Sequence, residues 1–189
     1  MSTTWIIVIA VVVLIAFVVM IYNRLVSLRQ NANQAFADID VQLKQRHDLI
    51  PNLVETVKGY ATHERGTLEA VIAARNSAVG AKGVQNQAAA EGVLGAALGK
   101  LIALAEAYPD LKANTNFQQL QSELSDIENK LAAARRFFNN AIGEYNTAIQ
   151  QFPAVLFAGA FGFAHRDFFD VGGDQRATLE TAPQVKFGS

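Results

Sequence analysis

Residues 117–152 read FQQLQSELSDIENKLAAARRFFNNAIGEYNTAIQQF, and this stretch decides the fold class. Its apolar side chains recur at alternating intervals of three and four residues, which is the spacing of one face of an α-helix. They are Phe117, Leu120, Leu124, Ile127, Leu131 and Ala134, followed after a slip of one residue by Phe138, Ile142, Tyr145, Ile149 and Phe152. Asn116 and Gln119 resemble a capping box, and Pro153 ends the pattern. We therefore expect one long amphipathic helix whose apolar face packs against other helices.

Two more helices are expected before this one. Apolar residues at the same spacing predict a first helix from Arg24 to Val79, kinked at Pro51, because no turn residues surround that proline. A helix–helix corner at Pro51 is the alternative. A glycine-containing loop at residues 80–83 then precedes a second helix over about residues 86–107. The sequence does not show the alternation of apolar and polar residues that indicates β-strands. It therefore predicts an all-α fold: an N-terminal transmembrane helix followed by a long antiparallel up-and-down helical bundle.

An unbroken apolar run over residues 5–22, WIIVIAVVVLIAFVVMIY, predicts the transmembrane helix. A helix of this length measures roughly 27 Å, close to the hydrocarbon thickness of a bilayer. Trp5 and Tyr22 stand at its two ends, where amphipathic rings favour the interface, and Phe17 lies between them. A cleaved signal peptide needs a basic start and a small-residue cleavage site, and neither is present, so we expect a retained anchor.

The basic residues that flank this run set the expected orientation. No Lys or Arg precedes it, whereas Arg24 and Arg29 follow it before any acidic residue. Under the positive-inside rule the N-terminus then lies outside and the helical domain in the cytoplasm. The chain is expected to divide into a membrane anchor (1–23), a helical domain (24–170) and a polar, mobile tail (171–189).

Composition and motifs argue against several functional classes. The chain is 51% hydrophobic with a net charge of -1, which excludes an intrinsically disordered protein and gives no basic surplus for nucleic acid. It has no cysteine, so thiolate chemistry and cysteine-bound metals are excluded. None of His47, His63 and His165 has a second histidine at metal spacing, and no nucleophile has an obvious base. We therefore predict no catalytic residue, no metal site, no cofactor and no enzymatic activity.

The most suggestive charge lies in the polar block just before Pro51. Arg46 falls where the apolar stripe of the first helix should continue, and a charge on a core stripe must find a partner or an exit. Asp48 and Glu55 are the expected partners. Two interpretations are open: a structural ion pair within the chain, or a contact that sets specificity between protomers.

Two apolar surfaces are candidates for contacts outside the chain. The second and third helices are too short to cover the whole first helix, so part of its stripe should stay bare and pair protomers side by side. The residues of this stripe are Leu25, Leu28, Ile39 and Leu43. The other surface is the Phe-rich segment 152–169, with Phe157, Phe161 and Phe163 as its contact residues. Three interpretations of it are open: a cap on the bundle, an interfacial membrane segment, or a protomer contact.

The chain resembles the LemA family of bacterial membrane proteins in blocks that lie in the same order over roughly residues 20–170. They include DIDVQLK from Asp38, DLIPNLV from Asp48 and YP at 108–109. The motif residues are Asp38, Asp40, Arg46, Asp48, Pro51, Asn52, Tyr108, Pro109, Asn114, Arg135, Arg136 and Asn146. The resemblance implies a single anchor in the bacterial inner membrane, an up-and-down bundle and no established enzymatic activity. The segment after Pro153 departs from the family pattern because it is unusually rich in Phe and Ala.

Three functions compete at this point. The leading hypothesis is a membrane-anchored scaffold of coiled-coil-like helices that self-associates and organises membrane or partner proteins, in keeping with the family's relation to a magnetosome protein. Its partners would be the lipid bilayer, further copies of the chain and other membrane proteins, but not nucleic acid. The second is a regulatory adaptor of another envelope protein, such as a membrane protease. The third, an enzyme using His47, His63 or the Asp38–Asp48 carboxylates, has the least support.

Overall fold

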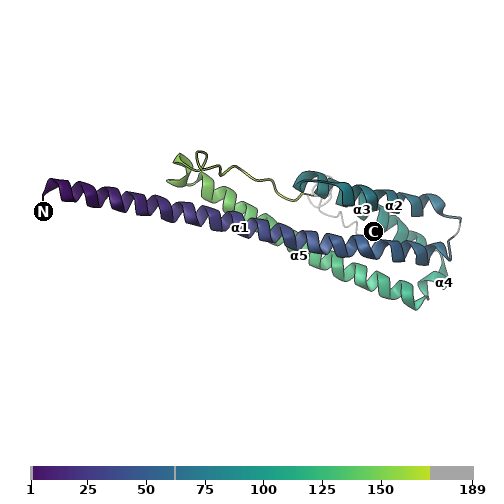
Figure 1. Cartoon of the computed structure of the whole chain (residues 1–189). Helices are drawn as coiled ribbons and strands as arrows, with labels where there is room; N and C mark the ends of the chain where they lie inside the picture. Colours follow the sequence, from purple (N-terminus) through teal and green to yellow (C-terminus); the bar gives the residue numbers. More distant parts are fainter. Residues whose placement is uncertain (1, 62, 171–189) are drawn as a thin grey trace, which may run out of the picture. The chain divides into compact units, whose positions relative to one another are not determined.

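The computed structural model describes residues 2–61 and 63–170 of the chain. These residues form five α-helices and one short 3-10 helix, with no strand among them (Figure 1): α1 (Thr3–Lys58), α2 (Arg65–Gly80), α3 (Val84–Ala105), α4 (Pro109–Lys112), α5 (Thr115–Gln150) and η1 (Ala154–Leu156). The all-α prediction is confirmed. The predicted polar tail, residues 171–189, lies outside the described residues. The described chain folds as two compact units, the first from residues 2–41 and 132–167, the second from residues 42–131 and 168–170.

The first helix is continuous through Pro51, but it ends earlier than predicted. α1 contains Pro51 in its interior, so a corner at this proline is wrong. The helix nevertheless stops at Lys58 rather than continuing to Val79. The backbone N–H groups of residues 60 and 61 both donate to the Val57 carbonyl, at 3.0 and 2.9 Å, and turn the chain. Ala61 is fully buried inside this turn, so the apolar pattern continues across a helix end and conceals it.

The other helices lie close to their predicted positions. α3 and α5 differ from the predicted ranges by about two residues at their ends, the usual uncertainty of a helix boundary. The N-cap of α5 is Asn114 rather than Asn116, because the Asn114 side-chain oxygen accepts a hydrogen bond from the Phe117 N–H at 3.0 Å. The Asn114 amide also donates to the Tyr60 hydroxyl at 2.9 Å. This cap therefore ties the start of α5 to the turn after α1.

The second unit is a four-helix arrangement built from the end of α1, α2, α3 and the start of α5, with α4 as a short connection (Figure 1). Successive segments run in opposite directions, as an up-and-down bundle requires. Its core includes Ile50, Leu53, Leu94, Leu101 and Leu111, all of them at most 1% exposed. α3 is long and apolar enough to cross a membrane by length and composition, but its apolar stripe lies in this core.

The first unit pairs only two helices, the middle of α1 and the end of α5. Ala32 and Ala35 of α1 are fully buried, and small side chains let helix backbones approach closely. The Phe36 and Phe138 rings pack with centroids 5.4 Å apart. The segment after α5 completes the unit, and the shared core is Leu25, Tyr145, Ala148, Ile149, Ala154, Ala158 and Phe163.

The expectation of a bare stripe on the first helix is wrong. Leu25, Ile39 and Leu43 are at most 1% exposed, and Leu28 is half-buried. The reason in the first unit is that the end of α5 and the segment after it pack on α1, so Leu25 and Leu28 join their core. Helix lengths alone do not reveal this cover, because the segment after α5 is irregular. A single chain therefore covers the residues that were predicted to contact another protomer.

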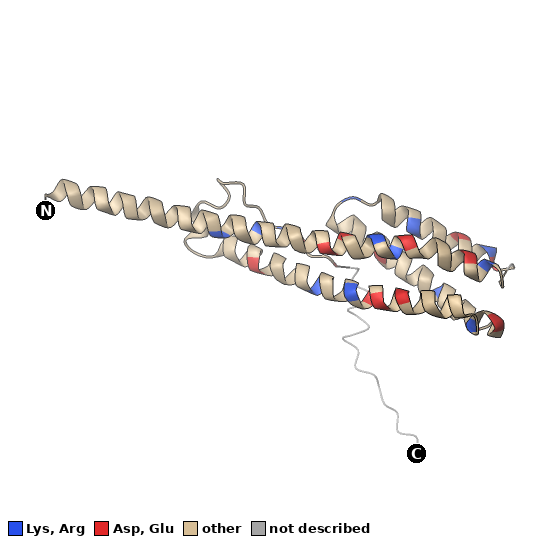
Figure 2. Cartoon of the chain, turned by 60° about the horizontal axis from the view of Figure 1, so that its bottom comes forward, with Lys and Arg blue, Asp and Glu red and all other residues tan. Residues whose placement is uncertain are grey.

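The predicted anchor is the N-terminal part of α1. Its most apolar window has a mean hydropathy of 3.2 and none of it is buried. Trp5 and Phe17 are 64% and 47% exposed, and Tyr22 is 38% exposed. Figure 2 shows no charged residue along this part of the helix. A helix that is apolar on every side and uncovered by protein matches a membrane span.

Candidate functional site

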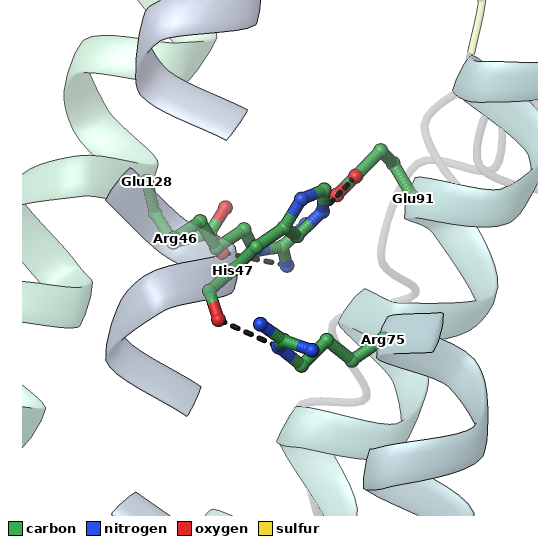
Figure 3. A network of polar contacts seen from close by, with 5 residues as sticks. All are labelled: Arg46, His47, Arg75, Glu91 and Glu128. Carbon is green, nitrogen blue, oxygen red and sulfur yellow. Dashed lines mark hydrogen bonds and ion pairs between the residues drawn. The ribbon is translucent and has the colours of Figure 1, made fainter. Parts of the chain in front are cut away.

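A cluster of polar side chains occupies the second unit, and three of its five members, Arg46, His47 and Glu91, are buried (Figure 3). Arg46 and His47 come from α1, Glu91 from α3, Glu128 from α5 and Arg75 from α2. Arg46 is 3% exposed and Glu91 only 1%. Because a buried charge is costly unless it is paired, the contacts of these two residues decide what the cluster does.

The Arg46 guanidinium forms ion pairs with two carboxylates. Its Nη1 donates to Glu91 Oε2 at 2.6 Å, and its Nη2 pairs with Glu128 Oε1, also at 2.6 Å. The second oxygen of Glu91, Oε1, lies 2.6 Å from His47 Nε2. Glu91 therefore contacts both Arg46 and His47, and Arg46 joins α1 to both α3 and α5.

The electrostatics of the cluster keep Glu91 ionised. Burial by itself would raise the pKa of its carboxyl. The interactions of Glu91 with His47 and Arg46 together outweigh burial, so the pKa of Glu91 lies below its ordinary value. An ionised carboxylate only accepts hydrogen bonds. Glu91 therefore acts as an acceptor within the cluster.

The missing backbone N–H of Pro51 allows a further hydrogen bond between α1 and α2. In an α-helix the N–H of residue 51 would donate to the carbonyl of residue 47, but proline has no N–H. The His47 carbonyl is thus available, and Arg75 Nε of α2 donates to it at 2.7 Å (Figure 3). The proline of the DLIPNLV block therefore leaves a backbone carbonyl of α1 free to accept a hydrogen bond from Arg75 of α2.

The expected partners of Arg46 were the wrong ones. Asp48 pairs instead with Lys44 at 2.7 Å on the surface, and Glu55 pairs with Lys58 at 3.3 Å. Structural ion pairing within the chain is nevertheless the correct interpretation of Arg46. The sequence held one unused signal: Glu91 falls on the apolar stripe of α3, among Ala88, Leu94 and Leu98. Two opposite charges on two core stripes favour mutual pairing. Glu128 carries no such signal.

The remaining motif residues lie at separate places. Asp38, Asp40, Asn52 and Arg136 are exposed, while Arg135 is half-buried. Asp38 lines a hollow of the first unit together with Asn31, Gln34, Phe137, Asn140, Ala141 and Glu144. Tyr108 is the N-cap of α4 and Pro109 its first residue. No group of His, Cys, Asp or Glu that could hold a metal ion occurs among the described residues.

Asn146 fastens the segment after α5 in the first unit. Its buried side-chain amide donates to the Arg166 carbonyl at 2.8 Å and accepts from the Arg166 N–H at 3.0 Å. Next to it, the Tyr145 hydroxyl donates to the Ala164 carbonyl at 3.0 Å. The Arg166 side chain reaches Asn33 Oδ1 of α1 at 2.7 Å. An extended stretch without secondary structure is thereby held against two helices.

The aromatic residues of the Phe-rich segment differ in exposure. Phe163 is 4% exposed and lies under the Arg29 guanidinium, 5.0 Å from its ring centroid. Phe157 is half-buried, whereas Phe161 is 49% exposed. Of the three predicted contact residues, Phe163 faces the interior of its own unit, which supports the capping interpretation for this ring.

The fold and these two sites define a class: a helical protein that carries an apolar N-terminal helix and an up-and-down bundle locked by a buried ion-pair cluster. The family model for the LemA family matches residues 35–187. The chain belongs to the LemA family, as its motif residues indicated.

Two relatives are similar over most of the chain. This chain is 27% identical over 190 aligned positions to "Magnetosome protein MamQ" of Magnetospirillum gryphiswaldense, and the alignment covers 85% of this chain and 70% of that protein. It is 25% identical over 188 positions to "Magnetosome protein MamQ 2" of Paramagnetospirillum magneticum, covering 86% of this chain and 69% of the relative. Together with the apolar N-terminal helix, the family and these relatives indicate a membrane-associated helical protein.

Proposed function

We propose that this protein is a single-pass scaffold of the bacterial inner membrane, which self-associates and organises membrane or partner proteins. The observation that carries the proposal is the continuity of α1. One helix, Thr3–Lys58, includes the exposed apolar stretch and then enters the four-helix bundle. The same helix therefore contributes residues to the apolar stretch and to the bundle, which suits a structural role.

The character of the charged cluster also supports a scaffold over an enzyme. Arg46 and His47 both contact the Glu91 carboxylate, and each of the three residues is less than 10% exposed. Catalytic groups must reach a substrate, whereas these groups connect helices. The relatives' names tie those proteins to magnetosomes, and our proposal for this chain takes from them only a role at a membrane.

Self-association and partner binding can be tested with two tagged copies of the full chain. The copies are co-expressed and extracted gently, and one tag is purified. Recovery of the second tag in large homomeric particles, imaged by electron microscopy, is the expected result. A defined complex with one other envelope protein would instead favour the regulatory adaptor. Recovery of the first tag alone, without companions, contradicts both functions.

The orientation can be tested with introduced cysteines, because the chain has none of its own. Ser2→Cys and Ser77→Cys variants are treated on intact cells with a reagent that does not cross membranes. The flanking arginines Arg24 and Arg29 predict that only the Ser2 variant reacts. Reaction of the Ser77 variant alone reverses the topology, and both variants must react after cell lysis as a control.

A further inference from the structure

The segment after α5 leaves an apolar face uncovered in the first unit. Its small residues Ala154 and Ala158 and the ring of Phe163 are buried against the two helices. Four large apolar side chains remain exposed: Phe152 at 80%, Val155 at 51%, Leu156 at 73% and Phe161 at 49%. These four residues form the outer patch. No residue between 152 and 164 is charged, and an exposed apolar surface of this kind marks an interaction site.

The segment that carries the outer patch meets α1 where the apolar run ends. The ring of Tyr22, the last residue of that run, has its centroid 5.4 Å from the ring of Phe161 and 5.6 Å from that of Phe163. On the other side, Arg29 lies over the Phe163 ring. Tyr22 and Arg29 are about 10 Å apart along a helix axis. The segment therefore occupies the boundary between the uncharged surface of α1 and its first charged residues.

We propose that the outer patch inserts into the headgroup–acyl boundary of the bilayer that α1 crosses. This inference rests on the proposed function, because it requires α1 to span the membrane. The bilayer is the occupant because the exposed apolar surface of residues 5–22 continues through Tyr22 to Phe161 without an intervening charge. A Tyr at the end of a span lies at headgroup level, so Phe161 lies at that level too.

The backbone of the segment limits how deeply it can enter. It consists of the three-residue helix η1 and turns, followed by extended chain from Phe163. Irregular backbone does not occur in contact with lipid in the hydrocarbon region, because its polar groups would lack partners. The uncharged stretch is also too short to cross a bilayer. Apolar side chains of interfacial segments enter about 5–10 Å while the backbone stays near the headgroups.

The test uses the full chain with one introduced cysteine, labelled in detergent with an environment-sensitive fluorophore. The protein is then placed in vesicles of phosphatidylcholine and phosphatidylglycerol that contain quencher-bearing lipids. Leu156→Cys reports on the outer patch, and Val12→Cys reports on the anchor. Val93→Cys is the matched control, because Val93 is an equally apolar residue, 63% exposed in the second unit.

The expected result is that the Leu156 label shifts to shorter wavelength and is quenched most by lipids whose quencher sits near the headgroup. The Val12 label should be quenched most by lipids with a deep quencher, and the Val93 label by neither. If Val12 is quenched and Leu156 is not, the inference is wrong while the membrane span stands. If Val12 is not quenched either, the proposed membrane anchoring fails as well.

A second copy of the chain is the competing occupant of the outer patch, and the same labels separate it from lipid. A contact between copies would protect the Leu156 label in detergent micelles also, and mixed donor- and acceptor-labelled chains would then transfer energy at this position. That outcome overturns the lipid assignment. Should the Leu156 variant lose helicity, Val155→Cys replaces it, since Val155 is also an exposed apolar residue of η1, at 51%.

Discussion

The two units of this protein pack their helices by different means. In the second unit four helical segments enclose a core, and this enclosure is complete enough to hold Arg46 and Glu91 at 3% and 1% exposure. In the first unit α1 and α5 are the only α-helices among the described residues, and a segment of turns, the short helix η1 and extended chain takes the place of further α-helices. That segment is fixed by hydrogen bonds that Asn146 and Tyr145 make to its backbone.

The difference follows from how many sides of a helix are covered. Two helices alone leave most of each helical surface in solvent, so a charge there needs no partner. Four helices exclude water, so a charge must be paired but then also fixes the register of the helices it joins. We infer that the ion-pair cluster specifies how the bundle of the second unit assembles, whereas Asn146 specifies where the irregular segment of the first unit lies.

The largest expected effect is the loss of Glu91. Glu91→Ala leaves Arg46 and His47 buried without their shared carboxylate, and removing one partner of a buried pair costs about 3–5 kcal/mol. Hydrogen exchange followed by mass spectrometry, on the full chain in detergent, should show this loss in peptides of α2 and α3. Peptides of residues 21–41 should be unchanged. Glu128→Ala is the control and should cost less, because that side chain is 40% exposed.

A smaller effect is expected from acidification. The folded-state pKa of Glu91 lies below its ordinary value of 4.5, so this residue's contribution to stability is complete above that value. The contribution declines as the pH falls further and is lost below the folded-state pKa. Thermal melts of the full chain should therefore fall less steeply with acidification in Glu91→Gln than in the wild type, since Gln does not titrate. Equal slopes in both proteins would contradict the assignment.

The surface pair provides the control for that experiment. The hydrogen bond from Lys44 also lowers the pKa of Asp48, but this side chain is exposed at the surface. Asp48→Asn should thus change the pH dependence only slightly, and added salt should remove the difference because exposed charges are screened. The buried pair of Arg46 and Glu91 should respond little to the same salt.

The sequence predicted helices better than it predicted their ends and partners. The spacing of apolar residues located α3 and α5, because that spacing is a local property of a helix. The same spacing did not reveal the end of α1 at Lys58, because the buried Ala61 of the turn continues the apolar pattern. The sequence feature that indicates this helix end is Gly59 directly after a lysine. Arg46 was recognised as a misplaced charge, but Glu91 and Glu128 lie on other helices, and local spacing does not give the register between helices.

In the first unit the decisive residue is Asn146. Asn146→Ala removes both hydrogen bonds to the Arg166 backbone, and leaving such groups unsatisfied costs about 1–3 kcal/mol. Exchange should rise in peptides covering 152–167 and stay unchanged in the second unit. Asn140→Ala, an exposed asparagine on the same helix, should have no such effect. If the two variants exchange alike, the asparagine does not fasten the segment.

The smallest expected effect concerns the link between α1 and α2 in the second unit. In the wild type, Arg75→Met leaves the His47 carbonyl without its only side-chain donor among the described residues. In a Pro51→Ala background the new N–H of residue 51 can donate to the same carbonyl, as in any α-helix. The cost of Arg75→Met should therefore be smaller in that background by about 0.5–1.5 kcal/mol, the worth of one hydrogen bond.

Exchange of α2 peptides in the four proteins of this double-mutant cycle measures the difference directly. Pro51→Ala alone should keep α1 helical and leave the stability unchanged or slightly raised, because it restores a backbone donor. Arg65→Met, an exposed arginine on α2, controls for the loss of a positive charge and should cost the same in both backgrounds. An equal cost of Arg75→Met with and without Pro51 would show that the proline does not create the site for Arg75.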